Sequence, residues 1–212
     1  MRTFLAALLV AVSAVASAAP ADDRAQALAG LDAPSADLRA ASVVWFSSNG
    51  TLADDKLLLP RLGDEDPKVR FLAERGMWLL WSRSGDDVVD ALMEKGGRQL
   101  GVRDLKAAIA TYSDVIRRKP AFAEGWNKRA TAYFLNGELR RSLDDCDEVL
   151  KRNPYHFGAL SGYGQIHFQL KQYDKAIEYW QRALKVNPNL AGLAGNIEVA
   201  RKMLAESRKS ST

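Results

Sequence analysis

The side chains best suited to catalysis are few in this chain and are not clustered. His156 and His167 are the two histidines, and Cys146 is the single cysteine. A Cys–His pair or a metal site needs such groups at the spacing of a shared site. Cys146 is remote from any plausible triad, so the sequence predicts no catalytic residue and no metal site.

Two other patterns that could act on a ligand have simpler explanations. Gly96-Gly97 and Gly101 do not form a phosphate-binding loop, because no strand precedes them and no Gly-Lys-Ser/Thr follows. The acidic run at residues 144–148 lies on the exposed face of a predicted helix, where solvated carboxylates are expected. We therefore predict that the protein is not an enzyme and uses no cofactor.

The elements that could position a binding site repeat along the second half of the chain. Pro120, Pro154 and Pro188 are equally spaced, and each closes a similar stretch. Their spacing is the 34-residue period typical of helical hairpins that stack into a solenoid. Counting back from each proline predicts hairpins at 89–122, 123–156 and 157–190.

The second predicted hairpin carries the most specific pattern. Trp126, Ala130 and Tyr133 lie on its first helix, and Ser142 and Pro154 follow. This pattern resembles the tetratricopeptide repeat (TPR). The resemblance implies an all-α fold, a right-handed α-solenoid of antiparallel helical hairpins, and a role in binding.

Close approach of the two helices in each hairpin explains the period. Small residues recur at two facing positions: Gly96, Ala130 and Gly164, opposite Ala108, Ser142 and Ala176. We expect the large side chains of Tyr112 and Trp180 to fill the space between successive hairpins. Cys146 stands where an aromatic residue is usual, which predicts a buried and inert thiol.

Two segments resemble a narrower family of TPR proteins from proteobacteria and plastids. They are residues 122–131, which include Glu124-Gly125-Trp126, and residues 156–162, which begin His156-Phe157-Gly158. The likeness covers residues 76–205 and implies the repeat fold without an established activity. Other TPR proteins clamp the C-terminal carboxylate of heat-shock chaperones with basic residues. The corresponding positions here hold one basic residue, Lys128, which argues against that ligand.

A weaker 31-residue period precedes the hairpins. It aligns Leu31, Leu38-Arg39 and Leu57-Leu58 with Leu62, Val69-Arg70 and Val88-Val89. Asp66 and Pro67 predict the cap and first residue of a helix over 67–83. The pattern resembles a short HEAT repeat. A plain helical linker domain is the alternative.

Trp45, Trp78 and Trp81 gather in this N-terminal half. Packing of Trp78 and Trp81 against the first TPR hairpin is the simpler interpretation. The alternative is an exposed aromatic platform, which would make the protein an enzyme accessory or a carbohydrate-binding or other ligand-binding protein.

The first helices of TPR arrays line the concave face, which predicts where a partner binds. The predicted peptide-binding groove consists of Met93, Leu100, Asn127, Thr131, Phe134, Ser161, Gln165, Phe168 and Gln169. Phe134 and Phe168 are one repeat period apart and should point into one groove. Aromatic, amide and hydroxyl side chains suit an extended peptide or an amphipathic helix. Packing of both phenylalanines against neighbouring helices is the alternative.

The N-terminus has the pattern of a cleavable signal peptide. Arg2 precedes an apolar run from Phe4 to Val15, and Ala16-Ser17-Ala18 supplies small residues for cleavage. Cleavage of residues 1–19 predicts a periplasmic or secreted protein, and an uncleaved anchor is the alternative. No second apolar run of membrane length follows.

Charge and element order complete the predicted organisation. The net charge of +4 is small and the basic clusters are short, which argues against nucleic acid as a partner. We expect HEAT-like repeats at 20–88, TPR hairpins at 89–190, a capping helix at 191–207 and a disordered tail at 208–212. The predicted function is a non-catalytic adaptor or assembly factor for a protein or peptide partner. Open solenoid ends are also compatible with self-association.

Overall fold

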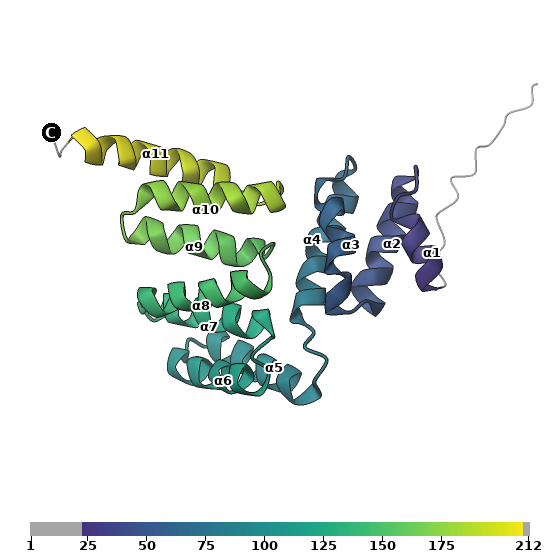
Figure 1. Cartoon of the computed structure of the whole chain (residues 1–212), viewed down its shortest axis with the longest axis horizontal. Coiled ribbons are helices and arrows are strands. Elements are labelled where there is room, and N and C mark those ends of the chain that lie inside the picture. Colours follow the sequence, from purple (N-terminus) through teal and green to yellow (C-terminus); the bar gives the residue numbers. More distant parts are fainter. Residues whose placement is uncertain (1–22, 210–212) are drawn as a thin grey trace, which may run out of the picture.

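Residues 23–209 are described by the structure, a computed structural model, and their regular elements are all helical. The N-terminal half contains α1 (Arg24–Gly30), α2 (Ala36–Asn49), η1 (Leu52–Asp54), α3 (Asp55–Leu58), η2 (Leu59–Gly63) and α4 (Pro67–Ser82). The C-terminal half contains α5 (Asp87–Gly101), α6 (Leu105–Arg118), α7 (Ala123–Leu135), α8 (Leu139–Arg152), α9 (Phe157–Gln169), α10 (Tyr173–Val186) and α11 (Leu193–Lys209). Figure 1 shows α5 to α11 stacked in a column, with α1 to α4 beside it. The all-α fold of stacked hairpins is thus confirmed.

Helices α5–α6, α7–α8 and α9–α10 form the three hairpins of the column. Their turns share one backbone feature, because Arg103, Gly137 and Lys171 recur at the repeat period and have φ of 59°, 79° and 59°. Helix α5 begins at Asp87, slightly before the predicted start of its hairpin at residue 89. The Asp86 carboxylate explains this, since it accepts hydrogen bonds from the backbone N–H groups of Val88 and Val89.

Each hairpin matches a small residue on its first helix with a side chain of fitting size on its second. A Cβ atom on Gly96 would lie 2.5 Å from Tyr112, and one on Gly164 would lie 2.4 Å from Trp180. These rings therefore pack against the glycine of their own hairpin. The sequence-based expectation placed them only in the space between successive hairpins. In the middle hairpin, Ala130 shares its core cluster with the smaller Cys146.

The 31-residue period of the N-terminal half corresponds to repeated contacts. The Nη1 atom of Arg39 donates to the carbonyls of Ala33 and Pro34, at 3.0 Å each. Arg70 donates to the carbonyls at the same two offsets, those of Asp64 and Glu65, at 2.8 and 3.0 Å. Helices α2 and α4, which contain these arginines near their starts, therefore begin with equivalent contacts. Their assignment as HEAT-like repeats stays a prediction.

The helix predicted over 67–83 is α4. The Asp66 carboxylate caps it by accepting hydrogen bonds from the N–H groups of Lys68 and Val69, and Pro67 is its first residue. The predicted start of this helix is thus confirmed. It could be predicted because both determinants lie next to each other in the sequence.

The predictions for the two ends of the chain concern a signal peptide, a capping helix and a tail. Helix α11 buries Leu193, Ile197 and Ala200 and continues to Lys209, into the segment predicted as a tail from 208. Basic side chains at 208 and 209 suit the negative end of the helix dipole. The predicted signal peptide (1–19) and residues 210–212 lie outside the described residues. No helix within 23–209 is long and apolar enough to cross a bilayer.

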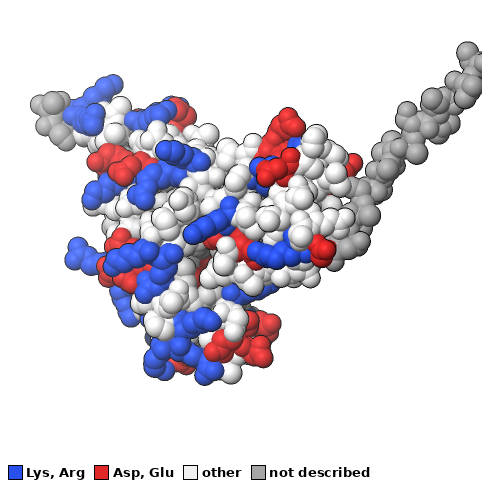
Figure 2. Space-filling view, turned by 45° about the vertical axis from the view of Figure 1, so that its right-hand side comes forward, with Lys and Arg blue, Asp and Glu red and all other residues white. Residues whose placement is uncertain are grey.

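Charged side chains alternate in sign over much of the surface. Figure 2 shows acidic side chains among the basic ones on the column of hairpins, rather than one continuous basic surface. Pairs one turn apart contribute to this pattern, such as Arg117 with Asp114 and Lys151 with Glu148. Such mixed faces are typical of solvated helices.

The N-terminal half packs on the loops that join successive hairpins, and we call this contact the seam. It involves residues 153–157 and 186–190, and Lys119 of the equivalent earlier loop donates to the carbonyl of Ser84 in the connection between α4 and α5. Phe157 belongs to the core of the N-terminal half, and Val186 and Leu190 pack against that core. Asn189 donates to the carbonyl of Leu62 at 2.8 Å and accepts from Arg70 at 3.0 Å.

Candidate functional site

A small pocket lies between α7 and α9, where the sequence predicts the groove. Its volume is about 170 Å³, and the predicted residues Asn127, Thr131, Phe134 and Gln165 line it. The remaining lining is small or apolar: Ala130, Ser142, Cys146, Gly158, Ala159, Gly162 and Ile166. The pocket lining thus combines apolar side chains with amide and hydroxyl groups.

The space in this pocket follows from one departure in the repeat. Cys146 occupies the position that Tyr112 and Trp180 hold in the flanking hairpins, one repeat period before and after. An aromatic ring there would occupy the volume beside Ala130. The thiol itself is buried, and burial raises the pKa of Cys146 to about 12. Cys146 is therefore a small buried side chain in the pocket lining rather than a nucleophile.

The other predicted groove residues lie around this pocket rather than in it. Met93 borders a neighbouring cleft of about 720 Å³ between α4, α5 and α7. Leu100 packs against the Tyr112 cluster, and the Ser161 carbonyl accepts a hydrogen bond from Trp180 at 3.1 Å. Gln169 is exposed at the end of α9.

Phe134 and Phe168 have different surroundings despite their equivalent positions. Phe134 lines the pocket and packs against the cluster that contains Tyr163 and Ile166, whereas the Phe168 ring lies 5.5 Å from the ring of Tyr173 and 5.7 Å from that of Trp180. Both rings therefore pack against neighbouring helices in part, and of the two only Phe134 also lines the pocket. The physical reason is again the size difference at the Cys146 position, since the last hairpin supplies a tryptophan that covers its phenylalanine.

Trp78 and Trp81 are parts of the seam and form no exposed platform. Trp81 is 2% exposed, its Nε1 donates to Asp55 at 3.0 Å, and its ring stacks on His156 at 4.3 Å. Trp78 lies against Gly158, where a Cβ atom would be 2.4 Å from its ring. The expected packing partner, the first hairpin, is therefore corrected to the junction of the second and third hairpins.

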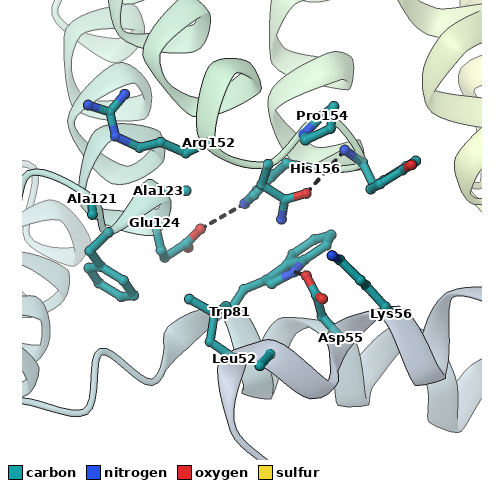
Figure 3. A pocket seen from close by; sticks show the side chains of 14 residues that line it. Leu52, Asp55, Lys56, Trp81, Ala121, Ala123, Glu124, Arg152, Pro154 and His156 are labelled. Atoms are coloured by element: carbon teal, nitrogen blue, oxygen red, sulfur yellow. Dashed lines mark hydrogen bonds and ion pairs between the residues drawn. The ribbon is translucent and has the colours of Figure 1, made fainter.

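Glu124 and His156 form a buried pair beside Trp81 that sequence reasoning did not find (Figure 3). The Nδ1 atom of His156 accepts from the N–H of Ala159 at 3.1 Å, so the proton lies on Nε2, which donates to Glu124 at 3.0 Å. Lys128 also contacts this carboxylate, at 3.1 Å. Burial alone would raise the pKa of Glu124, but the His156 and Lys128 interactions outweigh it and lower that pKa.

This pair has the residue types of an acid–base dyad but not its geometry. Both nitrogens of His156 are engaged, one in capping α9 and the other on Glu124. No nitrogen remains to accept a proton from a substrate. The available sequence signal was that Glu124 and His156 are the second and last residues of one predicted repeat, at which the chain enters and leaves the hairpin.

The described part of the chain offers no clustered metal ligands. Within residues 23–209, no group of three or more His, Cys, Asp or Glu side chains is placed to hold a metal ion. His167, the other histidine, is buried in a stack with Tyr163 and Tyr179, and its Nδ1 lies 2.6 Å from Gln172. Its surroundings are those of a packed side chain.

Comparison with known proteins identifies the hairpins. Family profiles described as "Tetratricopeptide repeat" match residues 93–156 and 159–190. The C-terminal half carries tetratricopeptide repeats. A TPR repeat-containing protein of Rhizobium etli is 31% identical over 134 residues, which are 63% of this chain and 66% of that protein. Hsp70-Hsp90 organizing protein of Triticum aestivum is 30% identical over 102 residues, 48% of this chain and 18% of that protein.

Solved structures agree with the TPR fold. The first TPR of Spaghetti (RPAP3), bound to the HSP90 peptide SRMEEVD, matches with a TM-score of 0.54 and 24% identity over 55% of this chain and 93% of that one. The Sgt2 TPR domain from Aspergillus fumigatus matches with a TM-score of 0.56 and 19% identity over 60% and 85%. These matches concern the fold, and the chain spans less than a fifth of the wheat relative.

Proposed function

We propose that the protein is a non-catalytic adaptor that holds a peptide or helical segment of a partner in the TPR groove. The pocket between α7 and α9 carries this proposal, because its lining combines apolar side chains with the polar side chains of Asn127, Thr131 and Gln165. An apolar anchor side chain with polar contacts around it is the usual arrangement at the centre of a protein interface. The peptide bound by the related RPAP3 domain supports the same class of function.

The groove residues favour an apolar anchor over an acidic chain terminus. Lys128, the basic residue at the positions of the chaperone clamp, is already paired with the buried Glu124. Gly158 and Gly162 stand at two of the other positions and supply no charge. We therefore propose a partner segment whose aliphatic or aromatic side chain enters the pocket beside Cys146.

Absence of catalysis is part of the same proposal. The Cys146 thiol is protonated at neutral pH, since its pKa is raised to about 12, and His156 has no free nitrogen. The carbohydrate-binding alternative loses its main support, because Trp81 is buried and Trp78 packs on Gly158.

Filling the pocket tests the groove without unfolding the protein. A Cβ atom on Gly162 would meet nothing within 4 Å, so Gly162→Leu should place a side chain in the pocket without a clash. A random peptide phage library is panned on the protein, and the strongest sequence is synthesised. Its affinity should fall at least about tenfold with Gly162→Leu.

Gly195→Leu on α11 is the matched control, because it also has open space and lies outside the pocket. Equal binding by both variants would exclude the groove as the binding site. Selection of peptides with no apolar residue would exclude the proposed anchor.

Export of the protein is a separate proposal that rests on the N-terminal sequence. The apolar run from Phe4 to Val15 and the small residues at 16–18 support cleavage near Ala18 or Ala19. Mass spectrometry of the protein from its native envelope fraction should find an N-terminus at residue 19 or 20. An intact Met1 would contradict the proposal.

A further inference from the structure

We propose that a second site, on the seam, binds an internal acidic segment of a partner protein. Two hollows of about 320 and 810 Å³ lie on either side of the Pro154–Tyr155 turn, and Lys56 borders both. We call this pair of hollows the seam valley. It involves α3, the 153–156 loop and α10, so it is distinct from the groove on α7 and α9.

The charges around the seam valley favour an anionic occupant. Lys56 and Lys185 have no ion-pair partner among residues 23–209. Arg182 lies 4.0 Å from Glu178, at the limit of an ion pair. Arg152 is also on the rim, where its Nη1 contacts Glu148 at 2.6 Å.

The carboxylates that border the valley are already engaged. Asp55 accepts a hydrogen bond from Trp81 at 3.0 Å, and Glu124 is buried with His156 and Lys128. Figure 3 shows Lys56 reaching from α3 toward the turn that carries Pro154 and His156. The unpaired positive charge therefore faces the hollow between the two halves of the molecule.

The apolar lining indicates a polypeptide rather than a purely charged polymer. Leu59, Leu160 and Val186 border the larger hollow, and Trp81 borders the smaller. Tyr155 stands between the hollows with 48% of its surface exposed. An extended peptide places alternate side chains on opposite sides. A segment that alternates acidic and aliphatic residues could therefore meet the lysines and the apolar walls together.

Binding of a model peptide tests this site. The probe is a fluorescent, C-terminally amidated peptide of alternating Glu and Leu, with Lys–Leu and Ser–Leu peptides as comparisons. Anisotropy should show binding of the Glu–Leu peptide that weakens with added salt. Lys56→Glu with Lys185→Glu should lower its affinity at least about tenfold, because two attractions become repulsions. Lys56→Gln with Lys185→Gln should give a smaller loss in the same direction.

The control is Lys95→Glu with Lys106→Glu, which makes the same change in net charge at exposed lysines of α5 and α6. Equal losses in both double variants would overturn the proposal, as would equal affinity for the Glu–Leu and Ser–Leu peptides. The proposal would also be overturned if the loss of Lys56 and Lys185 weakened the binding of a short DNA duplex more than the binding of the peptide. Gly162→Leu should leave this binding unchanged, so the two sites can fail independently.

Discussion

At the residue scale, His156 links the cap of one helix to a buried charge. Its Nδ1 satisfies the N–H of Ala159 in the first turn of α9, and its Nε2 holds Glu124 at the start of α7. One imidazole ring therefore links two neighbouring first helices. Trp81 covers that ring at 4.3 Å and excludes water from the pair.

Removal of the imidazole should be costly for this reason. His156→Ala leaves Glu124 buried with one partner fewer, uncaps α9 and opens a cavity under Trp81. We expect a loss of about 3–5 kcal/mol in the free energy of unfolding, measured by urea denaturation with circular dichroism. The double-mutant cycle with Glu124→Ala should show strong coupling, because each variant removes the same interaction. Additive effects would mean that the two side chains act separately.

Acid should weaken the N-terminal half through Asp54. Hydrogen bonds from Arg24, at 2.5 Å, and from Thr51 lower the pKa of Asp54 from 3.8 to about 2. Because the folded pKa is the lower one, ionised Asp54 stabilises the fold above about pH 4, and this contribution is lost as the pH falls toward 2. The free energy of unfolding should therefore drop across this interval. Asp54→Asn should flatten that part of the curve, and an unchanged slope would contradict the assignment.

At the element scale, two glycines of one helix have opposite roles. Gly164 faces Trp180 with no room for a methyl group, whereas Gly162 faces open space. Gly164→Ala should destabilise the protein by about 1–3 kcal/mol through overpacking. Gly162→Ala should stabilise it by about 0.5–1 kcal/mol, because alanine favours the helix interior. Urea denaturation of both variants checks the pair, and a shared sign would show that helix propensity rather than packing controls this helix.

The sequence predicted these elements because their determinants are local. The period of Pro120, Pro154 and Pro188 gave the register of the hairpins, and Asp66 with Pro67 gave the start of α4. Small-to-large matching was also partly readable, since Cys146 stands at an aromatic position. The depth of the pocket and the cover over Phe168 depend on how ring sizes combine across helices, which a single sequence does not specify.

At the scale of the whole molecule, the seam was beyond sequence reasoning. Trp81 and His156 are far apart in the chain, and no period relates the 31-residue and 34-residue repeats to each other. The Arg70 contact shows how they meet. In addition to the two carbonyls, the Arg39 guanidinium binds the carboxylate of Asp64 in the following unit. The Arg70 guanidinium instead binds Asn189 of the last hairpin. The loop after α10 thus takes the place that the next N-terminal unit would have.

The seam should make both halves unfold together. Trp81→Ala removes the ring that covers His156 and packs near Phe157, and we expect a loss of about 3–5 kcal/mol. Phe71→Ala on the same helix is the control, because that ring is 59% exposed. Tryptophan fluorescence, to which Trp78 and Trp81 of the seam contribute, and circular dichroism should give coincident transitions in the wild type. Two separated transitions would show that the halves are independent.

The spacing of the seam also limits how this molecule can evolve. Most repeat arrays can gain or lose a unit, because each unit contacts only its neighbours. Here Lys119 binds the Ser84 carbonyl, His156 meets Trp81, and Asn189 binds the Leu62 carbonyl, so three successive loops have three different fixed partners. Duplication of the middle hairpin would move Asn189 one unit away from Leu62 while Lys119 stayed in place. These contacts with the preceding part of the chain can therefore all form only when the number of hairpins is three.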